Sequence, residues 1–473
     1  MKKTLLSLFS LLALSLQGYS QGTPAISSFT PQASNLGAND IFVEIQAVDA
    51  NTAWALAGPQ DAPGTYLRTT NGGATWQKGS LIPTGFVGYS AGDIFALDAN
   101  TAFASLYNSS VGGGLIVRTT DGGATWQAVT TPGLATTAGT QFGAPLGFAN
   151  WVHFFDAQNG ICMGDPNASP TSGVVFFEVY TTSDGGTTWN RVPRSAGLSS
   201  DADDYGVTRQ YSVVGNTIWF TTLYDPATIT SPARVFKSTD RGLTWTNYTT
   251  NIPNRVDGVA FANANNGLIW NNENLSVTRD GGATWNTQTY STPFRSADVK
   301  AIPGGNVYVA VGTDATVASP SLANIGTSIS RDYGATWQTI DNQRNYATVS
   351  FVSGTVGWAA GLLPAAANGF DIGKYTGANI LSNRNAELQK SLAAYPNPSA
   401  NGIFTVQLAS GLKSGAKVRV LDVVGREVAT QQLNATAIAA KSTTVDLSKE
   451  RAGVYTLELR TDAGVAQQKL VVQ

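Results

Sequence analysis

The chain has 473 residues and is nearly balanced in charge, with 29 Lys and Arg against 31 Asp and Glu and a formal net charge of −2. This balance argues against nucleic acid or an anionic membrane surface as a partner, because both are bound through an excess of basic side chains. A single Cys162 and a single His153 exclude an intrachain disulfide and a zinc site built from Cys and His.

The first 20 residues have the pattern of a signal peptide. Lys2 and Lys3 precede a mostly apolar stretch from Leu5 to Leu16, and a small residue, Ser20, ends the segment. The apolar stretch is shorter than the roughly 20 residues that a membrane-spanning helix needs. We therefore expect cleavage after Ser20, export of the mature chain and no transmembrane segment.

Residues 21–380 carry an eight-residue motif six times, at intervals of 40 to 63 residues. Each copy reads Ser or Thr, any residue, Asp or Asn, any residue, and then Gly-x-Thr-Trp. In such a turn the Asp or Asn side chain accepts hydrogen bonds from its own loop, Gly permits a positive φ, and Trp packs between sheets. The third and eighth residues of the copies are Asn71 and Trp76, Asp121 and Trp126, Asp184 and Trp189, Asp240 and Trp245, Asp280 and Trp285, and Asp332 and Trp337.

These motif residues are predicted to be structural rather than metal-binding or catalytic. Six near-identical copies spread along an array do not converge on one site, and Asn71 replaces the acid without disturbing the pattern. We therefore expect no metal and no cofactor.

Aligning the motifs reveals a seventh module, at about residues 346–375, that lacks the motif. All seven modules have a large apolar residue five positions after a shared turn, and these residues are Trp54, Phe103, Ile161, Trp219, Leu268, Tyr308 and Trp358. Modules of about 40 to 60 residues with the two-residue period of strands are typical of four-stranded propeller blades. The predicted fold is all-β: a seven-bladed β-propeller, closed by a strand from residues 25–32, followed by a small C-terminal β-sandwich.

The motif resembles the Asp box, or bacterial neuraminidase repeat, of sialidase-like propellers, where it forms the turn between the third and fourth strands of a blade. Sialidases of that superfamily have six blades, an arginine triad, a Tyr–Glu nucleophile pair and an acid Asp. This chain has seven modules and only one arginine, Arg209, on the face that is expected to line the channel. Its blade count and its Gly-Gly-Ala-Thr-Trp form are more similar to those of the photosystem II assembly-factor-like (hypothetical stability factor) propellers. That resemblance implies a binding scaffold.

The first strand of each blade is expected to line the central channel, with alternate residues facing inward. Convergent polar groups with aromatic walls are typical of a small-ligand or glycan site. The alternative is that these polar residues only solvate a water-filled channel, and none is assigned a catalytic role. The candidate ligand-binding residues on this face are Glu44, Asp93, Trp151, His153, Arg209, Tyr211, Asp298 and Lys300.

Beyond residue 380 the pattern changes, and residues 381–390 have the composition of a polar linker. A second domain is predicted at residues 391–473, with a Tyr-Pro-Asn-Pro opening at 395–398, an Asp-x-x-Gly-Arg-Glu hairpin at 422–427 and a Gly-Val-Tyr strand at 453–455. These features resemble the type A C-terminal sorting domain of the Bacteroidetes type IX secretion system. The resemblance implies a small β-sandwich that the outer-membrane translocon recognises. The alternative is an ordinary appended β-sandwich with a binding role.

These features favour an exported propeller, secreted or on the cell surface, that binds a glycan or protein ligand and is not an enzyme. The alternative is a glycoside hydrolase of sialidase-like type that uses the channel carboxylates Glu44, Asp93 and Asp298. Hydrolysis requires two carboxyl groups about 5–10 Å apart across a cleft. The positions of these three residues therefore bear on the choice.

Overall fold

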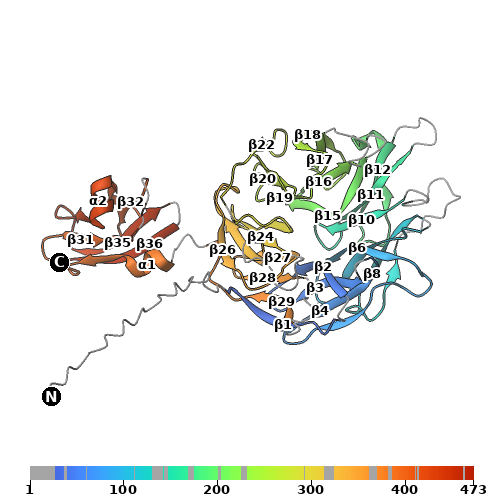
Figure 1. Ribbon diagram of the computed structural model, residues 1–473, viewed down its shortest axis with the longest axis horizontal. Helices are drawn as coiled ribbons and strands as arrows, with labels where there is room; N and C mark the ends of the chain where they lie inside the picture. Colours follow the sequence, from blue (N-terminus) through green and yellow to red (C-terminus); the bar gives the residue numbers. More distant parts are fainter. Residues whose placement is uncertain are drawn as a thin grey trace, which may run out of the picture. The chain divides into compact units, whose positions relative to one another are not determined.

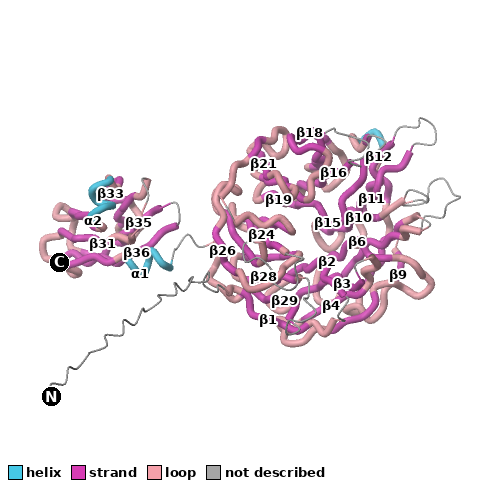
Figure 2. Tube along the Cα trace, in the orientation of Figure 1, coloured by secondary structure: helices cyan, strands magenta, loops and turns pink. Residues whose placement is uncertain are grey.

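The computed structural model divides the chain into two compact units, Met1–Gly377 and Ala378–Gln473 (Figure 1). Strands are the main regular element of both units, and the two α-helices of the described part of the chain belong to the second unit (Figure 2). The predicted signal peptide at residues 1–20 and residues 382–385 of the predicted linker lie outside the described residues. The structure describes residues 27–36, 40–59, 61–110, 112–129, 142, 147–168, 175–200, 204–224, 232–291, 293–313, 324–361, 370–381, 386–410, 412, 415–461 and 464–473.

The first unit is a ring of seven antiparallel sheets, which confirms the predicted propeller. The first strand of each blade contacts the first strand of the next blade, and the seventh contacts the first (Figure 1). Blade one comprises β2 (Asp40–Ala47), β3 (Ala53–Pro59), β4 (Thr65–Thr69) and β5 (Gln77–Ser80), and blade two comprises β6 (Ser90–Ala96), β7 (Ala102–Tyr107), β8 (Gly114–Thr119) and β9 (Gln127–Ala128). Blade three comprises β10 (Ala149–Phe154), β11 (Gly160–Ala168), β12 (Val175–Thr182) and β13 (Asn190–Arg191). A short 3-10 helix (Arg194–Ala196) follows, and β14 (Ser199–Ser200) pairs with β12 at the edge of blade three.

The remaining blades follow the same order outward from the channel. Blade four comprises β15 (Asp204–Val214), β16 (Thr217–Tyr224), β17 (Pro232–Ser238) and β18 (Thr246–Pro253). Blade five comprises β19 (Gly258–Phe261), β20 (Gly267–Trp270), β21 (Leu275–Thr278) and β22 (Asn286–Thr287). Blade six comprises β23 (Asp298–Ala301), β24 (Tyr308–Gly312), β25 (Gly326–Ser330) and β26 (Gln338–Asp341). The seventh comprises β27 (Thr348–Ser353), β28 (Val356–Ala360), β29 (Phe370–Tyr375) and β1 (Phe29–Ala33). The seven apolar residues that align after the shared turn are all fully buried.

The N-terminal strand β1 closes the ring as the outer strand of the seventh blade. It runs antiparallel to β29, with Phe29 opposite Tyr375. The Phe29 ring is 2% exposed and lies 5.3 Å from the ring of Tyr346 and 5.4 Å from that of Tyr375. The predicted closure by residues 25–32 is therefore confirmed, with the strand beginning at Phe29; residues 25 and 26 lie outside the described part.

Each eight-residue motif forms a turn between the third and fourth strands of its blade. In the second copy, Asp121 Oδ1 accepts hydrogen bonds from the Thr125 N–H (2.9 Å) and the Thr119 hydroxyl (2.8 Å), and Oδ2 accepts one from the Thr125 hydroxyl (2.6 Å). These bonds lower the pKa of Asp121 to about 2. Asn71 keeps the geometry because its amide donates to the Thr75 hydroxyl at 2.8 Å. These contacts give the motif a structural role in the turn.

A cation beside the motif links some blades to the next. Arg68 packs over the Trp54 ring of its own blade, with its guanidinium carbon 5.5 Å from the ring centroid, and donates to the Gly122 carbonyl of the next motif at 2.5 Å. Lys374 does the same in the seventh blade, over Trp358 at 5.1 Å and to the Ala50 carbonyl at 2.8 Å. The blade without a motif therefore still holds its neighbour.

The second unit is the predicted β-sandwich. A core that includes Phe404, Leu457 and Leu459 lies between its two sheets. The elements are α1 (Ala386–Ser391), β30 (Ala393–Tyr395), β31 (Ile403–Gln407) and β34 (Ser442–Asp446), with α2 (Ala435–Ala440); and β33 (Glu427–Gln432), β32 (Lys417–Leu421), β35 (Gly453–Thr461) and β36 (Gly464–Val472).

Candidate functional site

Side chains of the inner strands hydrogen-bond to the backbone of the next blade. An inner strand is a sheet edge, so part of its backbone N–H groups has no partner within the sheet. Acceptors from the preceding blade bind these groups. The pairs are Glu44 with Ile94 N (3.3 Å), Asp93 with Val152 N (2.8 Å), Asp298 with Val349 N (3.2 Å), Thr348 with Ile45 N (3.4 Å), Gln46 with Ala96 N (2.5 Å), Ser350 with Ala47 N (3.0 Å) and Ser212 with Phe261 N (2.8 Å).

Glu44 and Asp93 form a hydrogen-bonded carboxyl pair between blades one and two. Burial is the largest cause that raises the pKa of Glu44 well above its usual value, and the neighbouring Asp93 raises it further. Burial also raises the pKa of Asp93, although the hydrogen bonds from Glu44 and from the Val152 N–H oppose this. Both carboxyls are therefore protonated more readily than in water, and the rise is larger for Glu44.

Two cations balance these acids. Lys300 Nζ lies 3.3 Å from Asp298 Oδ1. Burial alone would lower the pKa of Lys300, but Asp298, Glu44 and Asp93 together raise it above the usual value, so Lys300 stays protonated. The second cation, Arg209, acts on the carboxyl pair through its charge and lowers the pKa of both members.

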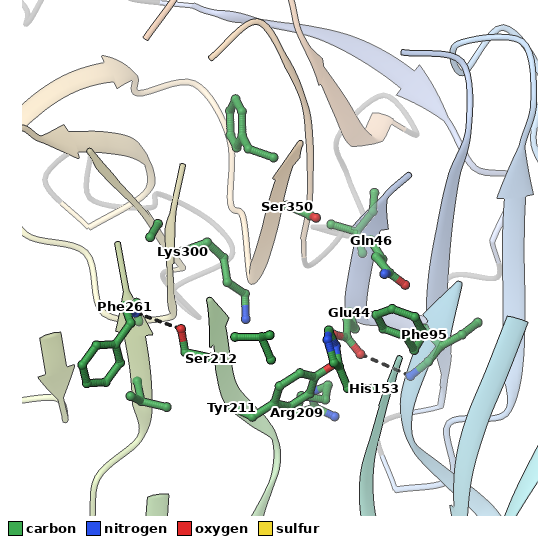
Figure 3. A pocket seen from close by; sticks show the side chains of 17 residues that line it. Glu44, Gln46, Phe95, His153, Arg209, Tyr211, Ser212, Phe261, Lys300 and Ser350 are labelled. Carbon is green, nitrogen blue, oxygen red and sulfur yellow. Dashed lines mark hydrogen bonds between the residues drawn. The ribbon is translucent and has the colours of Figure 1, made fainter. Parts of the chain in front are cut away.

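A cavity of about 260 Å³ lies in the channel among the inner strands. In Figure 3, Glu44, His153, Arg209 and Tyr211 gather at one side of it, and Lys300 extends toward them from β23. His153 Nδ1 is buried and has no hydrogen-bond partner among the described residues. Burial lowers the pKa of His153 to about 3, so the ring is neutral and serves as part of an aromatic wall.

Three rings around His153 meet it edge to face. The His153 ring centroid lies 4.7 Å from that of Phe95, 5.1 Å from Phe155 and 5.5 Å from Tyr211. Tyr211 in turn packs on Trp151, with centroids 4.7 Å apart. Edge-to-face pairs of this kind fix ring orientation beyond what apolar burial alone provides.

Five of the eight predicted site residues line the cavity: Glu44, His153, Arg209, Tyr211 and Lys300. Three do not. Asp93 and Asp298 lie behind the surface as buried contacts between blades.

Trp151 departs from the prediction that its ring lines the channel. It is fully buried in the core shared by blades three and four. The β10–β11 ladder shifts register between Ala149 and Trp151, as the ladders of blades one and two do just before Glu44 and Asp93, and the indole packs against blade four instead of facing the channel.

A second cavity, of about 350 Å³, lies toward the end of the channel where the inner strands begin. Its lining residues precede those of the first cavity along β2, β6, β15 and β27. We call it the mouth cavity. The spacing of the modules did not point to it, because its lining residues other than Arg209 lie outside the positions expected to face inward. Its apolar lining includes Ile41, Val43, Pro63, Ala91, Tyr107 and Ala347.

Arg209 lines both cavities and is the only charged residue among the described residues that line the mouth cavity. It lies in a bulge of β15, where the pairing with β16 jumps from Gly206 to Tyr211. Its backbone is left-handed, with a φ of 62°, and its Nη1 donates to the Gly92 carbonyl at 3.2 Å.

Within the described part of the chain, no group of three or more His, Cys, Asp or Glu residues is placed to hold a metal ion. No helix found there is both long enough and apolar enough to cross a membrane.

Seven antiparallel sheets around a polar channel define the first unit as a seven-bladed β-propeller. Residues 393–473 match the family described as the secretion system C-terminal sorting domain. The second unit is thus a type IX secretion sorting domain, which directs export to the cell surface or the extracellular space. This confirms the predicted export of the protein to the cell surface or the extracellular space.

No curated protein matches the chain. Among solved structures, the chain is similar to YCF48 bound to D1 peptide, with 16% identity over 75% of this chain and 99% of that chain and a TM-score of 0.49. It is also similar to PorZ, a surface component of the type IX secretion system of Porphyromonas gingivalis, with 13% identity over 92% of this chain and a TM-score of 0.47. That match spans 59% of the PorZ chain. YCF48 from Cyanidioschyzon merolae is similar at 15% identity, over 74% of this chain and 99% of that chain, with a TM-score of 0.44.

Proposed function

We propose that the protein is a non-catalytic binding propeller, delivered by the type IX secretion system, that takes a glycan or protein ligand at its channel. The observation that carries the proposal is the use of the channel carboxylates. Glu44, Asp93 and Asp298 each accept a hydrogen bond from the backbone of the next blade. Groups that hold blades together in this way are poorly placed to exchange protons with a substrate.

The arrangement of the acids supports the same proposal. A glycosidase needs two carboxyl groups about 5–10 Å apart, with the sugar between them. Glu44 and Asp93 instead touch each other through a hydrogen bond, and Asp298 is paired with Lys300. The indole of Trp151, which would have supplied an aromatic wall opposite two acids, is in the core.

A combined binding and turnover screen tests the proposal. The mature exported chain is applied to a glycan array and, separately, to a panel of fluorogenic glycosides. We expect no turnover of any glycoside, together with binding either on the array or in a parallel screen of extracellular proteins.

Variants distinguish the hydrolase alternative. Turnover that is lost in Asp93→Asn or Glu44→Gln, but kept in the rim control Asp121→Asn, would show that the channel acids are catalytic and would refute the proposal. The control removes a carboxylate of the same kind from a solvent-exposed turn. An absence of both turnover and binding would also count against a binding role.

A further inference from the structure

The mouth cavity is lined by apolar side chains, by polar groups and by a single cationic side chain. Ile41, Val43 and Ala347 contribute aliphatic surface, Tyr107 contributes an aromatic ring, and Arg209 contributes the only charge among the described lining residues. Ligand pockets are typically apolar, with a few polar groups that fix the orientation of the ligand. The composition therefore favours a ligand with an apolar body and one anionic group.

The backbone at Arg209 is arranged in an unusual way. Arg241 and Tyr333 also have a left-handed backbone. Both occur in the rim motif, at a position that Gly takes in the other copies. Arg209 instead lies inside a strand, within a bulge that interrupts the β15–β16 pairing. Bulges redirect side chains beside functional sites, and a left-handed non-glycine residue is held in that conformation at an energetic cost. The bulge places Arg209 between the two cavities.

The guanidinium of Arg209 has donors left for a ligand. Its one hydrogen bond to a described residue, from Nη1 to the Gly92 carbonyl, uses one of five N–H donors. A planar guanidinium matches a carboxylate in a two-bond geometry, which a lysine ammonium does not reproduce. The side chain is only partly buried, so the remaining donors are within reach of a molecule in the cavity.

We propose that the mouth cavity binds the carboxylate of an apolar acid, with Arg209 as its partner and the aliphatic and aromatic walls around its apolar body. The acid is a peptide C-terminus with an apolar last residue or a free aromatic or aliphatic carboxylic acid. This inference rests on the proposed binding function and names the ligand class at one end of the same channel.

Other ligand classes fit the cavity less well. An uncharged sugar would find Tyr107 and Thr208 as the only hydroxyl-bearing side chains among the described lining residues. A phosphate or sulfate group would meet one cation where two or more are usual for a doubly charged anion. A cationic ligand would be repelled by Arg209.

The test uses the full mature chain and four probes in calorimetric titrations. N-acetyl-Leu-Phe represents a peptide C-terminus, and 4-phenylbutyrate represents a free acid. The C-terminal amide of each probe has nearly the same shape without the charge. We expect at least one acid to bind, with its amide about tenfold weaker or more, because a charge-assisted hydrogen bond is lost. The acid that binds identifies the source of the carboxylate.

Three variants locate the binding. Arg209→Gln is expected to weaken the acid about tenfold or more, whereas Arg241→Gln, an arginine with an equally left-handed backbone (φ 61°) on the rim, leaves the affinity unchanged. Ala347→Trp keeps Arg209 but fills the cavity and is expected to abolish binding. Equal binding of acid and amide, unchanged affinity in Arg209→Gln or Ala347→Trp, or no binding of either acid would overturn the inference. A positive glycan array alongside such a failure would leave the binding function standing and refute only this ligand class.

Discussion

The raised pKa of Glu44 beside Asp93 gives a specific prediction for Glu44→Gln. A glutamine amide is able to donate to Asp93, and its carbonyl is able to accept from the Ile94 N–H, which lies 3.3 Å from Glu44 Oε2. Glu44→Ala removes both contacts. It leaves a backbone N–H and a buried carboxylate without their partner, at a cost of about 2–4 kcal/mol in the free energy of unfolding.

The pH dependence separates the two states of the pair. The pKa of Glu44 is raised in the folded protein, so its stabilising contribution is complete below the unfolded value of 4.5 and is lost as pH rises through the folded value. We therefore expect the stabilising contribution of Glu44 to decline as pH rises above 4.5. Relative to the wild type, Glu44→Gln is expected to be close to neutral at low pH and more stable at high pH.

Urea unfolding followed by tryptophan fluorescence measures this effect. All 11 tryptophans lie within the propeller unit, so the signal reports on the ring and not on the sorting domain. The reasoning is refuted if Gln costs as much as Ala near pH 5, or if the advantage of Gln over the wild type shrinks as pH rises.

Two further predictions concern the ring and its rim. Phe29→Ala is expected to lower the free energy of unfolding by about 3–5 kcal/mol, because it removes a buried ring from the closing strand; urea denaturation checks this, and a loss below about 1 kcal/mol would mean that β1 does not hold the ring. Asp240→Ala is expected to cost about 1–2 kcal/mol through the lost bonds to Thr244 and Ser238. Asp240→Asn is expected to cost much less, because Asn71 occupies the same motif position in the first copy and keeps the turn geometry. Equal melting temperatures for the Ala and Asn variants would contradict this account of the motif.

The fold was predictable because its signals are local and repeated. A turn such as Asn71–Trp76 contains within eight residues the acceptor, the glycines and the ring that it needs. The closing strand was also accessible, because the seventh module ends at Tyr375 without a fourth strand and residues near Phe29 fit the gap. These inferences required only chemistry within a segment or a count of modules.

The site was less predictable because it depends on contacts between blades. Strand periodicity indicated that Glu44 and Lys300 face the channel, but it carried no sign that Asp93 would bind the Val152 N–H of the next blade. A register shift moves side chains to the other face of the sheet, so the alternation of inward and outward residues does not hold across it. One such shift accompanies the burial of Trp151, and another, at the bulge holding Arg209, leads to a cavity that no spacing rule identified.

Ring closure by β1 has a consequence for the order of folding. Phe29 pairs with Tyr375, so the contact that completes the propeller joins residues 346 positions apart. Contacts of such long range form slowly, because the intervening chain must first be ordered. β1, the first propeller strand to be synthesised, therefore stays unpaired until β29, one of the last propeller strands, has been made. Until then the chain is an arc with two bare sheet edges, each able to pair with another copy. Its passage across the cell envelope must therefore either follow closure or keep neighbouring copies apart.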